Sequence, residues 1–290
     1  MGASPVNRMG TVERRAGAAR ALWPRRRAAS RPRTPVVFTL LGAVTALYLI
    51  GPIVYGFSGL SGDELRSFVA DPQAGGAILT SFGTATVSTL ILAALAVPLA
   101  HTLARRRGWQ ARLVGVLVML PLVLPPLMSG IVLLVVFGPY GPIGGPLAAR
   151  GIMLTDSNAG IVLAQTFVAA PFAVIGARSA FAALDREVEE AAAVEGAGAW
   201  ALFRYIALPL AWPGVAAALL LSWLRALGEF GATVVVAYHP YTLPVYAWVQ
   251  LSSTGLGATL PLVAVMVALT AVVVGLLGVS RRLGDVSDVS

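Results

Sequence analysis

The sequence predicts an all-α polytopic membrane protein that crosses the bilayer six times. Hydrophobic residues make up 57% of the 290-residue chain and charged residues only 12%, about half the share found in soluble domains. Six apolar runs reach about 20 residues, which as helices cross a hydrocarbon core of about 30 Å. We predict spans at about 36–57, 78–103, 113–137, 158–182, 211–237 and 257–279.

The first 35 residues precede the first span and contain nine Arg and one Glu. This composition predicts a disordered basic tail that lies against anionic lipid headgroups. A cleaved signal peptide is the alternative. The apolar stretch 36–57 is long for a signal core and has no clear small-residue cleavage site. We therefore expect an uncleaved first span, and a transmembrane domain over residues 36–280.

The arginines predict the orientation of the spans. Eighteen of the 21 Arg lie in the tail, the 104–112 loop, the 178–210 region and residues 281–290, whereas only Arg66 and Arg150 lie in the other connections. Cytoplasmic loops carry the excess of basic residues. We therefore expect both termini in the cytoplasm, with 281–290 as a short cytoplasmic tail, and this requires an even number of spans.

The third span contains the run "LPLVLPPLMSG", with Pro121, Pro125, Pro126 and Ser129. Proline removes a backbone donor and interrupts a helix, and within lipid the freed carbonyls need partners from other helices or from water. The run predicts a broken helix beside a cavity or pore. A packing kink without a role in transport is the alternative.

The fifth span carries two charged residues, Arg225 and Glu229, within "LRALGEFGAT". Residues four apart share a helix face. An unpaired charge at mid-membrane costs about 2.5–3.5 kcal/mol, and pairing lowers this cost without making the pair a stabiliser. We expect the pair to line a transport pathway or brace its gate, with Gly228 and Gly231 allowing close helix approach. A purely structural ion pair is the alternative.

Several residue types are absent, and their absence excludes whole classes of chemistry. The chain has no Cys, so disulfides, thiolate metal sites and Cys nucleophiles are excluded. It also has no Lys, so it has no P-loop and any ATP must be hydrolysed by another polypeptide. The only histidines, His101 and His239, are too far apart in sequence to suggest a metal site. The spans offer no Ser–His pair or paired Asp for an intramembrane protease. We expect no catalytic residue and no bound metal.

The connection 183–210 predicts two helices held outside the membrane. Asp185 is a suitable N-cap, and the acidic residues that follow it suit the positive end of a helix dipole. Gly196 and Gly198 interrupt the helix, and the apolar segment "WALFRYIAL" then leads to Pro209 and the fifth span. The small residues of the first helix suit insertion into a groove on a partner.

This connection resembles the cytoplasmic loop of the permease subunits of prokaryotic ABC importers, EAA-x3-G-x9-I-x-LP. The matching residues are Glu190, Ala191, Ala192, Gly196, Ile206, Leu208 and Pro209. The resemblance implies the type I importer permease architecture. It also implies that 183–210 is a coupling loop that docks into a cleft of a separate ATPase. ATP and Mg²⁺ would then bind to that ATPase, and this chain would bind no cofactor.

Two further segments resemble the molybdate, tungstate and sulfate permeases of this superfamily, and the likeness covers most of residues 75–280. They are "LPLVLPPLMSGIVLLVVFGPYGPIG" (120–144) and "RALGEFGATVVVAY" (225–238). Their amino-acid sequences resemble the molybdate type most. The resemblance implies import of a tetrahedral oxyanion, molybdate or tungstate first. The segment 238–250 departs from the molybdate pattern, so sulfate or thiosulfate stays open.

The resemblance also implies the partners. Two copies of the permease would pair in a prokaryotic cell membrane, with two ATPase subunits and an external oxyanion-binding protein, and without nucleic acid. The candidates for the pathway or gate are Pro125, Pro126, Ser129, Arg225, Gly228, Glu229 and Gly231. A secondary anion transporter or a channel is the alternative from another class. A secondary transporter would couple through acids such as Glu229 and often has an inverted repeat, which this sequence does not show, and it would leave the 183–210 motif unexplained.

Overall fold

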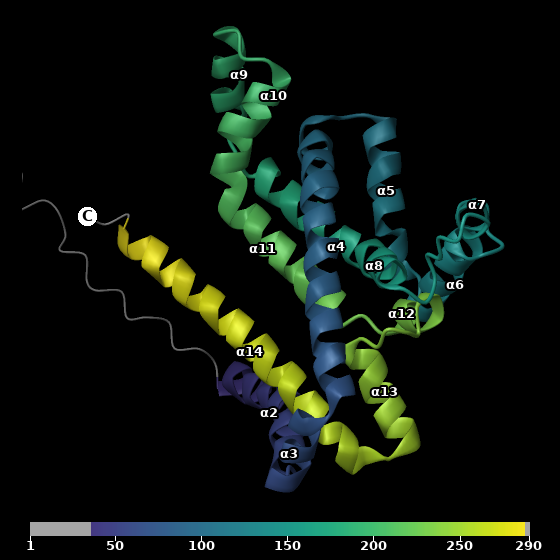
Figure 1. Ribbon diagram of the computed structural model, residues 1–290. Helices are drawn as coiled ribbons and strands as arrows, with labels where there is room; N and C mark the ends of the chain where they lie inside the picture. Colours follow the sequence, from purple (N-terminus) through teal and green to yellow (C-terminus); the bar gives the residue numbers. More distant parts are fainter. Residues whose placement is uncertain (1–35, 288–290) are drawn as a thin grey trace, which may run out of the picture. The chain divides into compact units, whose positions relative to one another are not determined.

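The computed structural model describes residues 36–287, and within that range the chain is helical, with no strand. The predicted basic tail 1–35 and residues 288–290 lie outside the described residues. The helices, labelled in Figure 1, are α2 Val36–Ser58, α3 Gly62–Ala70, α4 Pro72–Arg105, α5 Trp109–Val123, α6 Pro126–Phe137, α7 Gly144–Ala148, α8 Asn158–Ala182, α9 Arg186–Val194, α10 Ala199–Ala201, the π-helix η2 Leu202–Ala207, α11 Leu208–Leu227, α12 Gly231–Val236, α13 Leu243–Ser253 and α14 Leu256–Ser287.

Contacts along the chain divide it into two units, residues 1–55 and 56–290. The first unit holds most of α2, a 23-residue apolar helix without a single residue buried inside the chain. A helix that is apolar on every side and unburied requires lipid or another chain around it. Its bounds match the predicted first span.

The core of the second unit is formed by α4, α8 and α11, which pack against one another. Alanine is the commonest residue at the buried positions on these helices. A Cβ atom placed on Gly176 of α8 would lie 2.6 Å from the Cβ of Ala218 in α11, and one placed on Gly214 of α11 would lie 2.6 Å from the Cβ of Ala180. Small residues therefore bring these two backbones close together, as in other membrane helix pairs.

Two of the long helices, α4 and α8, begin at side chains that cap their free amides. The Asp71 carboxylate accepts from the amide of Gln73 (2.9 Å), with Pro72 as the first residue of α4. The Ser157 hydroxyl accepts from the amide of Gly160 (3.2 Å) at the start of α8. Both residue types are preferred at this position, because an acceptor side chain satisfies an amide that has no partner in the helix.

The third span is broken, as the prolines predict. Its two parts, α5 and α6, meet at an angle of 114°. Pro125 lies in the break and Pro126 begins α6, whereas Pro121 is accommodated inside α5. At 1.5 Å per residue the two parts are about 22 and 18 Å long, so neither alone crosses the hydrocarbon core.

The predicted continuous fifth span over 211–237 is wrong. A single helix of 29 residues, Ala199–Leu227, runs from α10 through η2 and α11. The chain leaves the helix at Gly228 and resumes it at Gly231 as the six-residue α12. The Glu229 carboxylate accepts from the amide of Ala232 (2.7 Å). In an unbroken helix this amide would bond to the carbonyl of Gly228, so the Glu229 side chain replaces that backbone bond.

The last helix also differs from the prediction. A short tail was expected from residue 281, but α14 continues to Ser287. Arginine is a good helix former, so the end of the apolar run, which ends a span, does not end the helix. The described residues contain five helices long and apolar enough to cross a membrane, or six if α5 and α6 count as one span, and the higher number agrees with the predicted six.

Within the second unit, the connections separate to two ends of α4 (Figure 1). The α4–α5 connection and α9 lie at one end, where Arg105 contacts Glu189. The start of α4 lies at the other end, where Ala74 packs against Leu243 and Tyr246 of α13. The Arg-rich connections 104–112 and 183–210 thus lie at the same end of the bundle.

Candidate functional site

The predicted coupling loop forms a helix that stands out from the bundle (Figure 1). The Asp185 carboxylate caps α9 by accepting from the amide of Glu187 (3.1 Å). Of the motif residues, Glu190, Ala191 and Gly196 are exposed and Ala192 is partly exposed. This surface of small residues around one acid is therefore available to a partner.

A left-handed residue ends α9. Gly196 has φ +91°, a conformation that favours glycine because other residues have a Cβ that clashes there. The turn is closed by bonds from the amide of Gly196 to the carbonyl of Ala193 (3.0 Å) and from the amide of Ala197 to that of Ala192 (3.1 Å). The remaining motif residues lie on the helix that follows: Ile206 in η2 and Leu208 and Pro209 in the first turn of α11.

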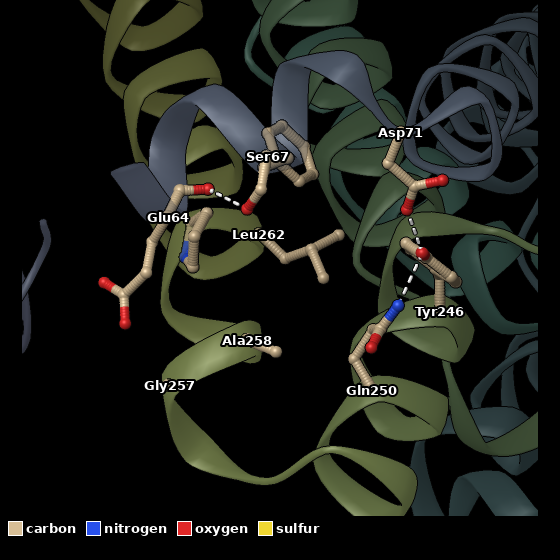
Figure 2. A pocket seen from close by; sticks show the side chains of 10 residues that line it. Glu64, Ser67, Asp71, Tyr246, Gln250, Gly257, Ala258 and Leu262 are labelled. Carbon is tan, nitrogen blue, oxygen red and sulfur yellow. Dashed lines mark hydrogen bonds between the residues drawn. The ribbon is translucent and has the colours of Figure 1, made fainter. Parts of the chain in front are cut away.

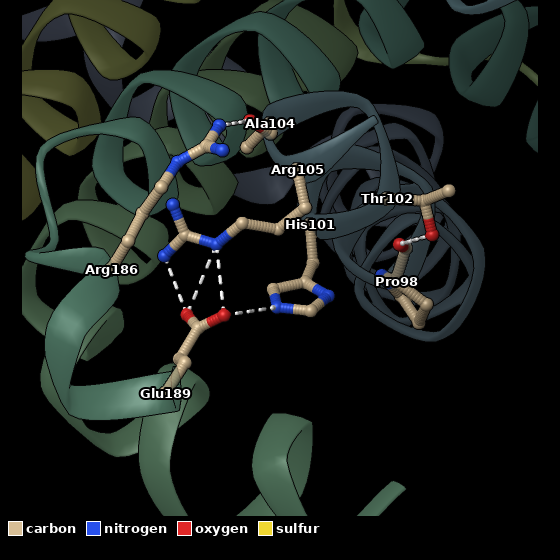
Figure 3. Close-up of polar contacts among 7 residues, drawn as sticks. All are labelled: Pro98, His101, Thr102, Ala104, Arg105, Arg186 and Glu189. Atoms are coloured by element: carbon tan, nitrogen blue, oxygen red, sulfur yellow. Dashed lines mark hydrogen bonds and ion pairs between the residues drawn. The ribbon is translucent and has the colours of Figure 1, made fainter. Parts of the chain in front are cut away.

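Glu189 ties α9 to the end of α4 (Figure 3). The Arg105 Nε donates to both Glu189 carboxylate oxygens, at 3.1 and 3.0 Å. The Nε2 atom of His101 lies 3.9 Å from the same carboxylate. The sequence pattern indicated only a helix-dipole role for Glu189 and did not single out Arg105. Glu189 lies one residue before the motif, and nothing in the sequence around it indicates that its side chain faces α4.

The charged pair of the fifth span is formed, although on a helix end rather than on a continuous helix face. An Arg225 guanidinium nitrogen lies 2.7 Å from one Glu229 oxygen, and the other oxygen accepts from the amide of Ala232. The Glu229 side chain is 1% exposed and that of Arg225 is 26% exposed. Both oxygens of the acid are engaged, whereas the guanidinium still has surface of its own.

The two helix breaks meet. A Cβ atom on Gly231 would lie 2.8 Å from the Cβ of Pro126 and 3.0 Å from the amide nitrogen of Leu127, so α12 approaches the start of α6 closely at this glycine. Gly228 differs, since its nearest neighbour is the carbonyl of Leu224 in its own helix, at 3.6 Å. The hydroxyl of Ser129 is buried in α6 without a hydrogen-bond partner among the described residues.

An open pocket of about 340 Å³ lies between α3, α13 and α14 (Figure 2). The Tyr246 hydroxyl donates to the Asp71 carboxylate and accepts from the Gln250 side-chain nitrogen (2.5 Å). Burial raises the pKa of Tyr246, and the neighbouring Asp71 raises it further. Glu64 also lines the pocket. With two acidic residues in its lining, Glu64 and Asp71, the pocket does not suit an anion. The sequence pattern did not indicate this pocket.

Among residues 36–287, no group of three His, Asp or Glu side chains is placed to hold a metal ion. His101 packs against Phe181 and Phe203, with ring centroids 5.1 and 5.2 Å apart. His239 lies against Tyr238 and Tyr241, far from His101 in sequence and without an acid beside it in these contacts. The two histidines therefore pack against different sets of aromatic residues.

The fold is that of the membrane subunits of ABC transporters. The crystal structure of a bacterial alginate ABC transporter, in complex with an alginate pentasaccharide-bound periplasmic protein, matches with a TM-score of 0.66 at 18% identity. The match covers 86% of this chain and 94% of that chain.

The family follows from the sequence comparisons. The chain belongs to the binding-protein-dependent transport system inner membrane components, whose family model matches residues 94–283. A probable molybdenum ABC transporter permease protein of Haloferax volcanii is 43% identical over 79% of this chain and 84% of its own length. A molybdate/tungstate transport system permease protein of Thermococcus kodakarensis is 36% identical over 83% of this chain and 93% of its own length. The chain is thus a membrane-embedded transport component and not an ATPase.

Proposed function

We propose that the protein is the permease subunit of an ATP-driven importer for a tetrahedral oxyanion, molybdate or tungstate. The observation that carries this proposal is the similarity, over most of both chains, to relatives named as molybdenum and molybdate/tungstate permeases. The resemblance of segments 120–144 and 225–238 to molybdate-type permeases agrees with it. Membership of the binding-protein-dependent family argues against a secondary transporter or a channel.

The translocation pathway is formed between two copies of this chain. The helix breaks at 124–125 and 228–230 support a pathway beside them, because irregular backbone in a membrane is tolerated where it is buried in protein or lines a water-filled cavity. Pro125, Pro126 and Ser129 form one side of this junction. Gly228 lies at the opposite break, and Gly231 gives the close contact between the two sides.

Arg225 is the residue that faces the anion, and Glu229 holds it in place. The Glu229 carboxylate is buried with both oxygens engaged, so it would not repel a dianion at the surface of the pathway. The Arg225 side chain is partly exposed, and one of its nitrogens is paired with Glu229. The planar set of five N–H groups of a guanidinium suits an oxyanion.

The coupling loop carries the motion of the ATPases to the spans. α9 presents Glu190, Ala191 and Ala192 to a cleft of the ATPase, and Gly196 sets the turn that follows. Ile206, Leu208 and Pro209 continue directly into α11, the helix that carries Arg225. Two ATPase subunits bind and hydrolyse ATP with Mg²⁺, and this chain binds no cofactor.

The loop end of the bundle faces the cytoplasm of a prokaryotic cell, with both termini on that side. The Arg-rich connections at this end support the orientation, and the basic tail 1–35 would lie against the inner lipid headgroups. An external binding protein delivers the oxyanion at the opposite end. The selectivity of the importer resides largely in that protein.

The experiment is uptake of radiolabelled molybdate by the complex of this chain with its ATPase and binding protein, reconstituted in proteoliposomes. We expect ATP-dependent uptake that a tenfold excess of tungstate suppresses and the same excess of sulfate or thiosulfate does not. Suppression by sulfate or thiosulfate instead would assign the importer to those anions. Uptake without ATP would contradict an ABC importer altogether.

A further inference from the structure

The end of α4 is fastened to α9 by a group of polar contacts that the proposed function does not use (Figure 3). Arg105, the last residue of α4, and Glu189, in the middle of α9, are 84 residues apart in sequence. Three hydrogen bonds join them, two from Nε and a third from a terminal nitrogen at 2.5 Å. We name this pair the latch.

The latch is shielded from water. The side chains of Arg105 and Glu189 are only 16% and 14% exposed. His101 lies beside the carboxylate and packs against Phe181 of α8 and Phe203 of η2. Charge-assisted, bidentate arginine–carboxylate bonds are about twice as strong as neutral ones, and partly buried pairs are screened by salt much less than exposed ones. The latch is therefore a firm contact rather than a loose surface pair.

A second contact fastens the same two helices. A guanidinium nitrogen of Arg186, in the first turn of α9, donates to the carbonyl of Ala104 (3.4 Å). This carbonyl belongs to the last turn of α4, where carbonyls have no partner within the helix. The C-terminal end of a helix carries partial negative charge, so Glu189 would be repelled from the end of α4 without Arg105. Arg105 offsets this repulsion and therefore favours the position of α9 against the end of α4.

The chain itself does not connect α9 to α4. Along the sequence, α9 joins α8 on one side and the α10–η2–α11 helix on the other. α4 meets α9 only in space, through the contacts above, while its other faces pack against α8 and α11 in the core. A force applied to α9 reaches α8 and α11 through covalent bonds, whereas it reaches the end of α4 through the latch and the weaker bond from Arg186.

We propose that Arg105 and Glu189 are positioning residues that make α4 move with α9 as one body, so that closure of the ATPases moves three spans of each permease together. This inference rests on the proposed function, in which α9 is the helix that docks on the ATPase. The latch stays closed throughout the transport cycle. Loss of the latch lets α9 move while α4 lags, and ATP is then hydrolysed without a matching number of import events.

Charge reversal tests the latch. We compare Arg105→Glu, Glu189→Arg and the double variant in the reconstituted complex, and measure import events per ATP hydrolysed. We expect each single variant to lower this ratio by about fivefold or more, the lower bound of a typical coupling between sites. The double variant, which restores an opposite-charge pair, should recover most of it. Arg106→Glu makes the same charge change as Arg105→Glu at an exposed neighbouring position outside α9 and should leave the ratio unchanged.

Each result bears on the proposal. A wild-type ratio in the single variants would overturn it, as would a double variant no better than the singles. Failure of the proposed function would look different, because the unmodified chain would then neither co-purify with its ATPase nor import.

A covalent link keeps the test decisive even if charge reversal impairs folding. The chain has no native Cys, so Arg105→Cys together with Glu189→Cys gives a single pair for a short bis-maleimide. We expect the unlinked double-Cys complex to be uncoupled and the linked complex to regain the wild-type ratio. A linked complex that hydrolyses ATP but cannot import would overturn the claim that the latch stays closed.

Discussion

Arg225 and Glu229 each depend on the other, but to different degrees. Glu229 is fully buried and also bonds to the amide of Ala232 at the start of α12. Removing the arginine alone would leave a buried carboxylate without its counter-charge, and breaking such a pair costs about 3–5 kcal/mol. A single substitution of Arg225 therefore mixes a loss of structure with any loss of function.

A double variant separates these effects. In Arg225→Met with Glu229→Gln, no charge is left uncompensated, and the Gln carbonyl can still accept from the amide of Ala232. We expect normal membrane insertion and ATPase binding, with molybdate uptake reduced at least about tenfold, since about 1.4 kcal/mol of lost anion stabilisation suffices for that factor. Initial uptake rates at equal amounts of assembled complex provide the measurement. Wild-type uptake would show that the pair is only structural.

At this scale the sequence predicts contacts better than it predicts roles. The i, i+4 spacing correctly places Arg225 against Glu229, although Glu229 lies just beyond the end of α11. The bond from the amide of Ala232 to Glu229 was not predicted, since it exists only because the helix breaks. Gly231 lies in close contact and Gly228 does not, and this distinction depends on where α6 packs, which no local pattern contains.

Among the helices, α9 owes its shape to one glycine. Gly196 and Gly198 both have open space around the position of a Cβ atom, but only Gly196 has a positive φ, whereas Gly198 has φ −70° and ψ 162°. A side chain at Gly196 thus meets backbone strain without any clash with a neighbour. Left-handed backbone costs an ordinary residue about 1–2 kcal/mol.

The two glycines form a matched pair for a test of the coupling loop. We expect Gly196→Val to abolish stimulation of ATP hydrolysis by the loaded binding protein, because the turn after α9 is displaced from the ATPase. Gly198→Val should retain it, since extended backbone suits valine. Membrane insertion of both variants, checked by extraction and size-exclusion chromatography, should match the unmodified chain. Equal stimulation in both variants would contradict the assignment of this loop.

The helices show where sequence patterns are sufficient. Apolar runs place α2, α4, α8 and the membrane part of α14, because lipid imposes one requirement on all of them, a helix about 20 residues long. The same search misses α3, α7 and α13, which are too short to span. The Ser61–Glu64 capping box that begins α3 was readable as an S-x-x-E motif. The helix break after Leu227 could not be predicted from the sequence, because glycine is common inside the apolar helices of membrane proteins.

For the whole molecule, the absence of Cys makes the orientation directly measurable. We expect a single Arg150→Cys variant to react with a membrane-impermeant maleimide in intact spheroplasts, and an Arg107→Cys variant to react only after lysis. Both positions are exposed and lie in connections predicted to face opposite sides of the membrane. The reverse labelling pattern would invert the proposed topology and place the α9 end outside, away from ATP.

The packing of α8 against α11 has a consequence for the assembled bundle. Gly176 faces Ala218 and Ala180 faces Gly214, so each close contact pairs one glycine with one alanine. A slip by four residues, about 6 Å at 1.5 Å per residue, would set Ala180 against Ala218 in one direction and Gly176 against Gly214 in the other. The first arrangement overlaps two methyl groups, and the second leaves a gap. These four residues therefore fix the alignment of α8 along α11, because the present alignment avoids both the overlap and the void. A larger movement of the bundle then has to carry α8 and α11 together.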